Sequence, residues 1–113
     1  PQFDAAAQPM VPAIKTAGLE DRVKLISHDG VDVNMDWVRN QDVQVMDAAF
    51  PDPDYVGWVL MDQTLRGLAG AEPAVLPIPA RIFDSSNIPP AGEELHANFG
   101  DYKTAFTKLW NVG

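Results

Sequence analysis

Val23-Lys24-Leu25-Ile26-Ser27-His28-Asp29-Gly30 is the stretch from which the fold can be inferred. Its apolar residues suit a buried strand, and Gly30 lets the chain turn where a residue with a Cβ would resist. In open α/β sheets, ligands bind at the carboxyl ends of the strands. We therefore expect a strand over 23–27, with His28 and Asp29 at its ligand-binding end. A plain strand-ending turn with a solvated Asp29 is the reading that this octapeptide alone favours.

Helices and strands are expected to alternate on either side of this stretch. Helices are predicted over 5–19, 34–40, 53–68 and 102–110, and further strands over 43–50 and 80–84. Proline is costly inside a helix, so an alternative is that the regular part of the first helix begins only near Pro9 or Pro12. Asp52 followed by Pro53 is a strong helix start, and Asp101 is the expected cap of the last helix. Asn34 is expected to cap the short helix.

This alternation predicts βαβ units and a parallel sheet, so the expected fold class is α/β, Rossmann-like or flavodoxin-like. Three short strands make a small parallel sheet, and both faces of a parallel sheet need cover. With 113 residues the chain is at most one domain. We therefore expect an incomplete lobe, either the C-terminal part of a larger α/β protein or a chain that pairs with another.

Composition excludes several classes of function. Sixteen acidic residues against eight basic ones give a net charge of −8, which opposes binding to nucleic acid or to an anionic membrane surface. The absence of cysteine excludes disulfides, thiolate metal sites and cysteine nucleophiles. No apolar stretch is long enough to span a bilayer, and the first residues are not a signal peptide. We expect either a cytoplasmic protein or a leader outside this sequence.

Catalytic and metal sites are not expected. Neighbouring residues on a strand point to opposite faces, so His28 and Asp29 should be poorly placed for a mutual hydrogen bond. No serine lies in a nucleophile-elbow motif, and His28 and His96 have no metal-ligand spacing. The three tryptophans fall on predicted helices, where packing is a commoner role than stacking on a ligand.

Several short patches together resemble the type I periplasmic sugar-binding proteins, the ribose-binding-protein-like solute-binding components of ABC transporters. They are the polar strand end Phe3-Asp4, the alanine-rich 5–7, Ala17-Gly18, and Ser27-His28-Asp29-Gly30. The similarity continues through a strand ending at Phe50-Pro51, a helix beginning at Asp54-Tyr55-Val56-Gly57, and a tail with Asn87-Ile88 and the 106–110 helix. The resemblance covers nearly the whole chain, but no patch is as specific as a metal-ligand signature.

The resemblance implies a set of ligand-binding residues. Asp29 takes the family position that hydrogen-bonds sugar hydroxyls, and His28 takes the position that packs against the sugar ring. Phe3 and Asp4 lie at a second contact point, where the family often has Asn. Ala49 replaces the usual Gln or Asn at the hinge, and Phe50 or Asp47 are candidates to substitute for it. No cofactor and no metal are implied.

The resemblance also implies a domain organisation and a function. Residues 1–113 would form the C-terminal part of such a protein. Within it, 1–50 would belong to the C-terminal lobe, 51–79 would be a hinge crossing and helix, and 80–113 would contain the return strand and C-terminal helix. A missing N-terminal lobe would supply the other half of the cleft. The expected function is capture of a sugar or polyol, without catalysis, for an ABC permease, in the periplasm or another extracytoplasmic space.

The sequence leaves two alternatives open. One is the effector-binding core of a LacI-type transcription regulator, which shares the fold but needs a DNA-binding helix-turn-helix before residue 1. The other is a small flavodoxin-like enzyme that uses His28, although no cofactor loop is recognisable.

Overall fold

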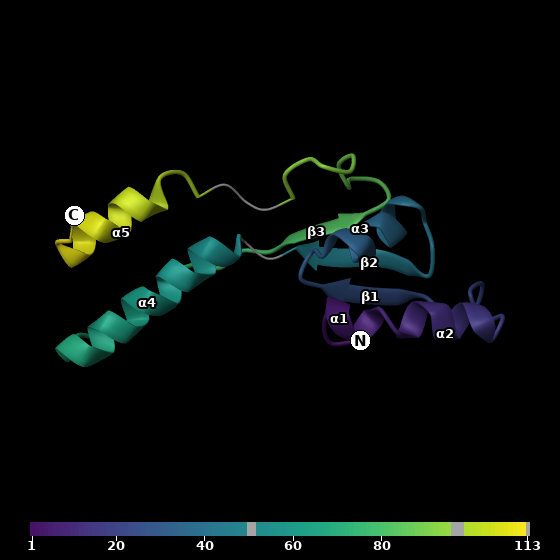
Figure 1. The fold of residues 1–113 in the computed structure, drawn as a ribbon, viewed down its shortest axis with the longest axis horizontal. Helices are drawn as coiled ribbons and strands as arrows, with labels where there is room; N and C mark the ends of the chain where they lie inside the picture. The colour runs from purple at the N-terminus through teal and green to yellow at the C-terminus, as the bar shows by residue number, and fades with distance from the viewer. Residues whose placement is uncertain (50–51, 96–98, 113) are drawn as a thin grey trace. The chain divides into compact units, whose positions relative to one another are not determined.

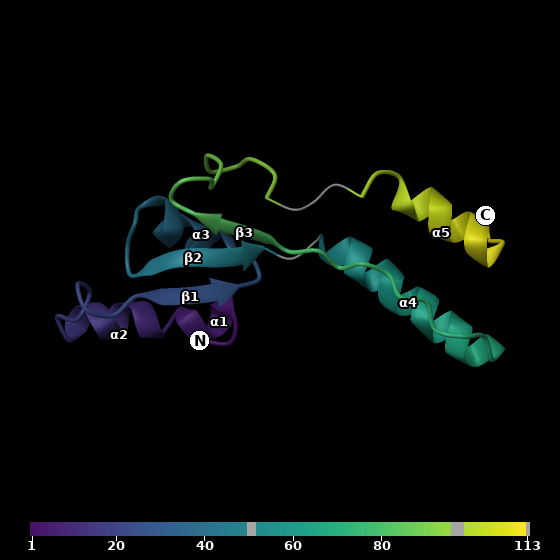
Figure 2. The ribbon, with the colours of Figure 1, turned by 180° about the vertical axis from the view of Figure 1, so that it is seen from behind.

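The computed structural model describes residues 1–49, 52–95 and 99–112, and its fold is a small α/β fold (Figure 1; Figure 2 from behind). The helices are α1 (Asp4–Ala7), α2 (Met10–Thr16), α3 (Asp32–Arg39), α4 (Pro53–Ala69) and α5 (Tyr102–Trp110). The strands are β1 (Leu25–His28), β2 (Gln44–Ala49) and β3 (Arg81–Asp84). The predicted α/β class is therefore confirmed.

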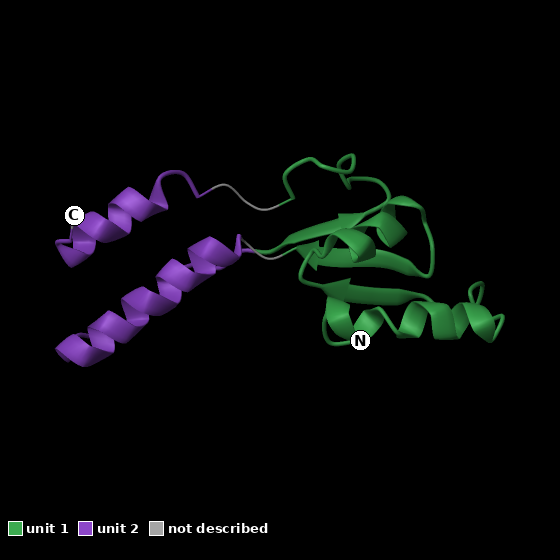
Figure 3. Cartoon of the chain, viewed as in Figure 1, with its two compact units in different colours: residues 1–50, 80–96 green, residues 51–79, 97–113 purple. Residues whose placement is uncertain are grey.

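The chain divides into two compact units (Figure 3). Unit 1 comprises residues 1–50 and 80–96, and unit 2 comprises residues 51–79 and 97–113. The chain thus passes from one unit to the other after residues 50, 79 and 96. Unit 1 contains the sheet with α1, α2 and α3, and unit 2 contains α4 and α5.

The sheet of unit 1 has the strand order β1-β2-β3 and is mixed. β1 and β2 are parallel, with Ser27 opposite Asp47, whereas β3 runs antiparallel to β2, with Phe83 opposite Asp47. The prediction of an all-parallel sheet was wrong for β3. Ala49, the last residue of β2, lies opposite Arg81, the first residue of β3. The chain leaves and re-enters the sheet at the same end, so β3 has to run back along β2.

One face of this sheet is covered and the opposite face is open in the described part of the chain. Figures 1 and 2 show α1 and α2 beside β1, and α3 beside β2 and β3. Ile26 lies opposite Met46, and Ile82 lies opposite Ala48, so both isoleucines are on one face because residues two apart on β2 share a face. Each isoleucine is 60% exposed.

The core of unit 1 consists of two apolar clusters on the covered face. The first cluster joins α3 to β2 and β3 and contains Met35, Ala49, Phe83 and Leu95, with Ile88 packed against it. The second contains Val11, Leu25 and Val43, with Ile14 and Trp37 packed against it. Trp37 therefore contributes to packing, as expected of a tryptophan on a helix.

The structure corrects two details of the predicted helices. The stretch 5–19 is not one continuous helix but two, α1 and α2, and α2 begins directly after Pro9, as the proline alternative predicts, because proline has no N–H for the helical hydrogen bond. Asn34 does not cap α3. That helix begins at Asp32, after Val31, and Asn34 lies inside it, fully buried.

The helix starts predicted for unit 2 are confirmed. Asp52 precedes α4 and accepts a hydrogen bond from the Asp54 N–H at 2.9 Å, and Pro53 is the first helical residue. Gly70 ends the helix in the left-handed conformation, with φ 66°. Asp101 caps α5 by accepting from the Thr104 N–H at 3.1 Å.

An aromatic cluster packs α4 against α5 within unit 2. Its buried members are Tyr55, Val59 and Phe106, and the half-buried side chains around them are Trp58, Leu76, Phe99, Tyr102 and Trp110. The Trp58 and Trp110 rings stack with their centroids 5.2 Å apart and 6° between their planes. Both tryptophans thus have the packing role that the sequence predicts for them.

Candidate functional site

The candidate site lies at the carboxyl end of β1, in the turn that leads to α3. Asp29 follows the strand with φ 124°, and Gly30 continues with φ 79°. The Asp29 N–H donates to the Ala48 carbonyl at 3.1 Å, so the turn stays attached to β2. A residue with a Cβ rarely adopts such a φ, and conformations of this kind concentrate at functional sites. Asp29 is therefore held in a costly conformation that points its carboxylate outward.

His28 and Asp29 contact each other directly, contrary to the expectation from strand geometry. His28 Nδ1 and Asp29 Oδ1 are 2.7 Å apart, and their side chains are 37% and 42% exposed. The expectation was wrong because Asp29 lies beyond the end of β1, and its positive φ breaks the alternation of side chains. The turn thus presents a hydrogen-bonded imidazole and carboxylate at the surface of unit 1.

Asp4 lies beneath this turn and is fully buried. Its Oδ2 atom accepts a hydrogen bond from the Val31 N–H at 2.8 Å. Asp47, on β2, is also fully buried, and its Oδ1 atom accepts from the Gly30 N–H at 3.1 Å. The two buried carboxyl groups therefore accept hydrogen bonds from the consecutive N–H groups of Gly30 and Val31, and so they support the turn that carries Asp29.

Asp47, buried beside Asp4, has an unusually high pKa for a carboxyl group. Burial, together with hydrogen bonding to Asp4 and the charge of Asp4, raises the pKa of Asp47 from its ordinary 3.8 to about 7. Hydrogen bonds from the Gly30 N–H and from Gln44 act in the opposite direction and lower it. The net effect is that the Asp47 carboxyl keeps its proton up to about neutral pH.

A chain of buried amides, absent from the sequence-based expectations, completes the support. Gln44 Nε2 donates to Asp47 Oδ2 at 2.7 Å, and Asn34 Nδ2 donates to Gln44 Oε1 at 2.8 Å. Gln8 Nε2 donates in turn to Asn34 Oδ1 at 3.1 Å. The polar residues Gln44 and Asp47 inside an otherwise apolar strand were the available signal, since buried polar side chains require such partners.

The remaining predicted site residues have separate positions. Phe3 precedes α1 and is 41% exposed. Phe50, predicted as a ligand contact and hinge residue, lies outside the described residues, as does His96. The structure therefore brings His28, Asp29 and the buried Asp4 to one turn, and it gives no position for Phe50.

A polar pocket of about 380 Å³ adjoins the same turn. It lies between the turn, α3 and the segment after β3, and its lining residues are Gly30, Asp32, Arg39, Gly92, Glu93, Glu94 and Leu95. The Arg39 side chain donates to the Pro89 carbonyl at 2.9 Å and pairs with Asp36 at 2.7 Å, so it ties α3 to that segment. A polar molecule of modest size could enter beside Gly30.

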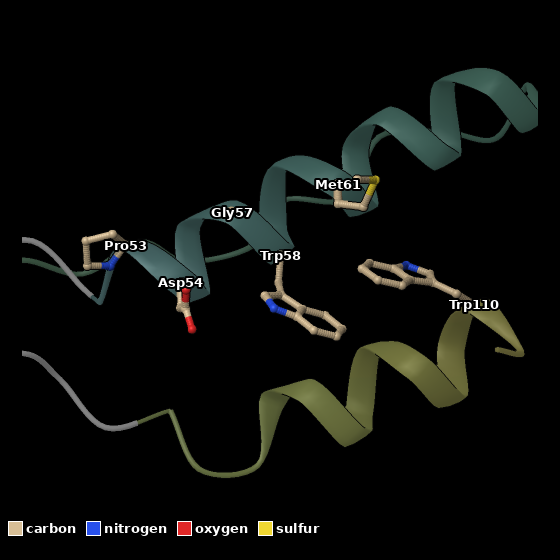
Figure 4. Close-up of a pocket in the computed structure, with 6 residues that line it drawn as sticks. All are labelled: Pro53, Asp54, Gly57, Trp58, Met61 and Trp110. Atoms are coloured by element: carbon tan, nitrogen blue, oxygen red, sulfur yellow. The ribbon is translucent and has the colours of Figure 1, made fainter. Parts of the chain in front are cut away.

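A second pocket, of about 350 Å³, lies within unit 2 between α4 and α5 (Figure 4). Its lining residues are Pro53, Asp54, Gly57, Trp58, Met61 and Trp110. Figure 4 shows the facing rings of Trp58 and Trp110 at one side of it and Asp54 at the other. Lys103 Nζ binds Asp54 Oδ2 at 2.9 Å, so this carboxylate already has a partner.

Within residues 1–49, 52–95 and 99–112, no three side chains of His, Cys, Asp or Glu are grouped so that they could hold a metal ion. No helix in the described ranges has the length and apolar character required to cross a membrane. Comparison with family models, with curated proteins and with solved structures finds no significant match. A functional interpretation therefore depends on the geometry of the turn at the end of β1.

Proposed function

We propose that this chain is part of a solute-binding component of an ABC importer, one that binds a sugar or similar polyol without catalysis. The observation that carries the proposal is Asp29. Its carboxylate is exposed at the carboxyl end of a strand, in a φ of 124°. Ligands of open α/β sheets bind at such strand ends. A plain surface turn does not require an exposed carboxylate in a strained backbone conformation, supported by the buried carboxyl groups of Asp4 and Asp47.

The chemistry of the turn suits hydroxyl groups. An ionised carboxylate accepts hydrogen bonds only, and two oxygens can accept from two adjacent hydroxyls of a sugar. His28 contributes a flat ring beside Asp29 and orients its Oδ1 atom at 2.7 Å. The Asp29 carboxylate, beside the imidazole, is then the group offered to a ligand. Phe3 and Phe50 remain the proposed aromatic contacts, and Asp4 acts in this proposal through the turn that it supports.

A second lobe is part of the proposal. The open face of the sheet exposes Ile26 and Ile82, and α4 exposes Leu60 at 61% and Leu68 at 81%. Such apolar surface is expected to be covered by further protein. The chain passes between its two units three times. The exposed apolar surface supports an N-terminal lobe that covers the cleft, and the three crossings support hinges between the lobes. In this proposal a permease recognises the closed form in an extracytoplasmic space.

Isothermal titration calorimetry of the full-length protein with a panel of pentoses and hexoses tests the proposal. We expect saturable binding of at least one sugar, and we expect Asp29→Ala to weaken it by about a hundredfold or more, because hydrogen bonds to a charged group are each worth ~1.5–3 kcal/mol. Asp21→Ala is the matched control, since it removes an exposed carboxylate from the loop between α2 and β1. No heat with any sugar, or equal affinity of both variants, would reject the proposal.

The contact between His28 and Asp29 supports one second candidate, an enzyme of flavodoxin-like fold. A carboxylate hydrogen-bonded to an imidazole can orient it as a general base. The same calorimetry separates the two functions. A binding protein gives heat that saturates with added sugar, whereas an enzyme gives a steady heat flow that scales with protein and is abolished by His28→Gln.

A further inference from the structure

Asp4 and Asp47 have an incomplete set of hydrogen-bond donors. Asp47 Oδ1 accepts from Gly30, Asp47 Oδ2 accepts from Gln44, and Asp4 Oδ2 accepts from Val31. Asp4 Oδ1 is buried and has no donor within the described residues. A buried polar atom without a partner is costly, and native proteins avoid it. One donor is therefore missing from the pair.

No positive side chain among the described residues supplies the missing donor. None of the ion pairs formed among the described residues includes Asp4 or Asp47. Both carboxyl groups are fully buried. Two ionised carboxylates in contact in a dry site repel each other strongly, and such pairs keep one proton between them. A shared proton provides both the missing donor and the missing charge compensation.

Charged groups also occur on the elements that pack around this pair. They are His28 on β1, Asp29 in the turn, Asp32, Asp36 and Arg39 on α3, and Arg81 and Asp84 on β3. The charge that raises the pKa of Asp47 is that of its partner Asp4. His28 is the imidazole among these groups, and it contacts Asp29 in the same turn. A test of the pair must therefore be separated from any contribution of His28.

We propose that Asp4 and Asp47 share one proton and act as positioning residues for the turn 29–31, so that loss of this proton weakens ligand binding at Asp29. The part concerning ligand rests on the proposed function, whereas the part concerning the proton does not. With the proton present, the two carboxyl groups hold the Gly30 and Val31 amides on adjacent acceptors. When solvent removes the proton, the two negative charges repel, the acceptors separate, and the turn that carries Asp29 shifts.

The variant Asp4→Asn tests the proton directly. The introduced asparagine can keep its carbonyl oxygen on the Val31 N–H and place its NH₂ group where Asp4 Oδ1 has no donor. The variant therefore imitates the protonated pair at every pH. His28→Gln is the matched control, because it removes the imidazole from the same turn and leaves the buried pair intact.

The readout is the amide ¹H–¹⁵N resonances of Gly30 and Val31 in the ligand-free protein, followed by NMR from about pH 5 to about pH 9. In the His28→Gln background, where no imidazole contributes, we expect one transition near neutral pH, and we expect none once Asp4→Asn is added to it. A transition that persists in the double variant, or that is absent from His28→Gln alone, overturns the proposal. So does a transition that moves on addition of CaCl₂ or of EDTA, since a bound cation would then replace the proton.

Sugar titrations at the two ends of this pH range test the consequence for the ligand. We expect the affinity of the natural protein to fall by about tenfold or more as pH rises, and that of Asp4→Asn to stay within about twofold, within the usual range of coupling between two sites. Equal pH dependence in both proteins overturns the positioning role. If no sugar binds at any pH, the proposed function fails while the NMR transitions still decide whether the pair shares a proton.

Discussion

Gly30 lies against Ala49: a Cβ added to Gly30 would stand 2.8 Å from the Ala49 Cβ and 3.2 Å from its Cα. The first distance is shorter than real Cβ contacts, and the neighbouring atoms belong to a strand that cannot move easily. Gly30 also has φ 79°, a conformation that favours glycine. The turn after β1 thus requires glycine for two independent reasons, backbone conformation and close packing against β2.

We expect Gly30→Ala to lower the free energy of unfolding by about 2–4 kcal/mol, the sum of left-handed strain and overpacking. Gly18→Ala is the matched control, because Gly18 has φ 64° with no atom within 4 Å of an added Cβ. It should cost only about 1 kcal/mol from strain. Urea unfolding of both variants measures the difference, and equal losses would show that the contact with Ala49 has no energetic effect.

Asp62 joins the two helices of unit 2. It is 1% exposed, and it accepts from Arg66 Nε at 2.7 Å and from Trp110 Nε1 at 3.0 Å. We expect Asp62→Asn to destabilise the protein by about 2 kcal/mol, since hydrogen bonds to a charged group are lost or weakened. Trp110→Phe removes the indole donor while keeping an aromatic ring, and it should cost about 1 kcal/mol. Urea unfolding that finds Asp62→Asn unchanged would contradict this account.

The Asp62 carboxylate also makes the stability of unit 2 depend on pH in the acidic range. The hydrogen bond from Arg66, followed by that from Trp110, lowers the pKa of Asp62. Its stabilisation is therefore fully present above the ordinary pKa of 3.8 and is lost as pH falls through the lower pKa of the folded state. The loss on acidification should be smaller in Asp62→Asn than in the natural protein.

The buried pair Asp4 and Asp47 in unit 1 makes stability depend on pH in the opposite direction, near neutral pH. The pKa of Asp47 is raised from 3.8 to about 7, so the folded protein binds more protons than the unfolded chain between these values. Stability should therefore fall as pH rises through this interval, by up to about 1.4 kcal/mol per pH unit. Urea unfolding at about pH 5 and about pH 8 should find this slope reduced in Asp4→Asn. An unchanged slope would mean that other groups produce it.

Signals within a few residues were sufficient to predict the helices of unit 2 and the positions of the strands. Asp52 with Pro53, and Asp101, specify helix starts locally, because each supplies a side-chain acceptor for a free N–H of the first turn. β1 and β3 begin and end within two residues of the expected limits. The direction of β3 was not predictable in this way, since it depends on where the chain re-enters the sheet.

The candidate site was predictable only in part. Asp29 and His28 were identified from a strand followed by a glycine turn, and both lie at the carboxyl end of β1. Their mutual contact was missed because it depends on the φ of Asp29, which its residue type does not suggest. Asp4 was expected beside a ligand, but it is buried beneath the turn, with its carboxylate on the Val31 amide.

By itself the sequence determined the α/β class, the order of helices and strands, and the glycine turn that carries Asp29, because each depends on propensities, caps and periodicity over short distances. Tertiary structure alone decided that Asp4, Asn34, Gln44 and Asp47 form one buried polar network behind that turn. These residues come from α1, α3 and β2, and their separations along the chain have no regular period. Only the packing of these elements brings the carboxyl groups together, and only their burial makes the shared proton necessary.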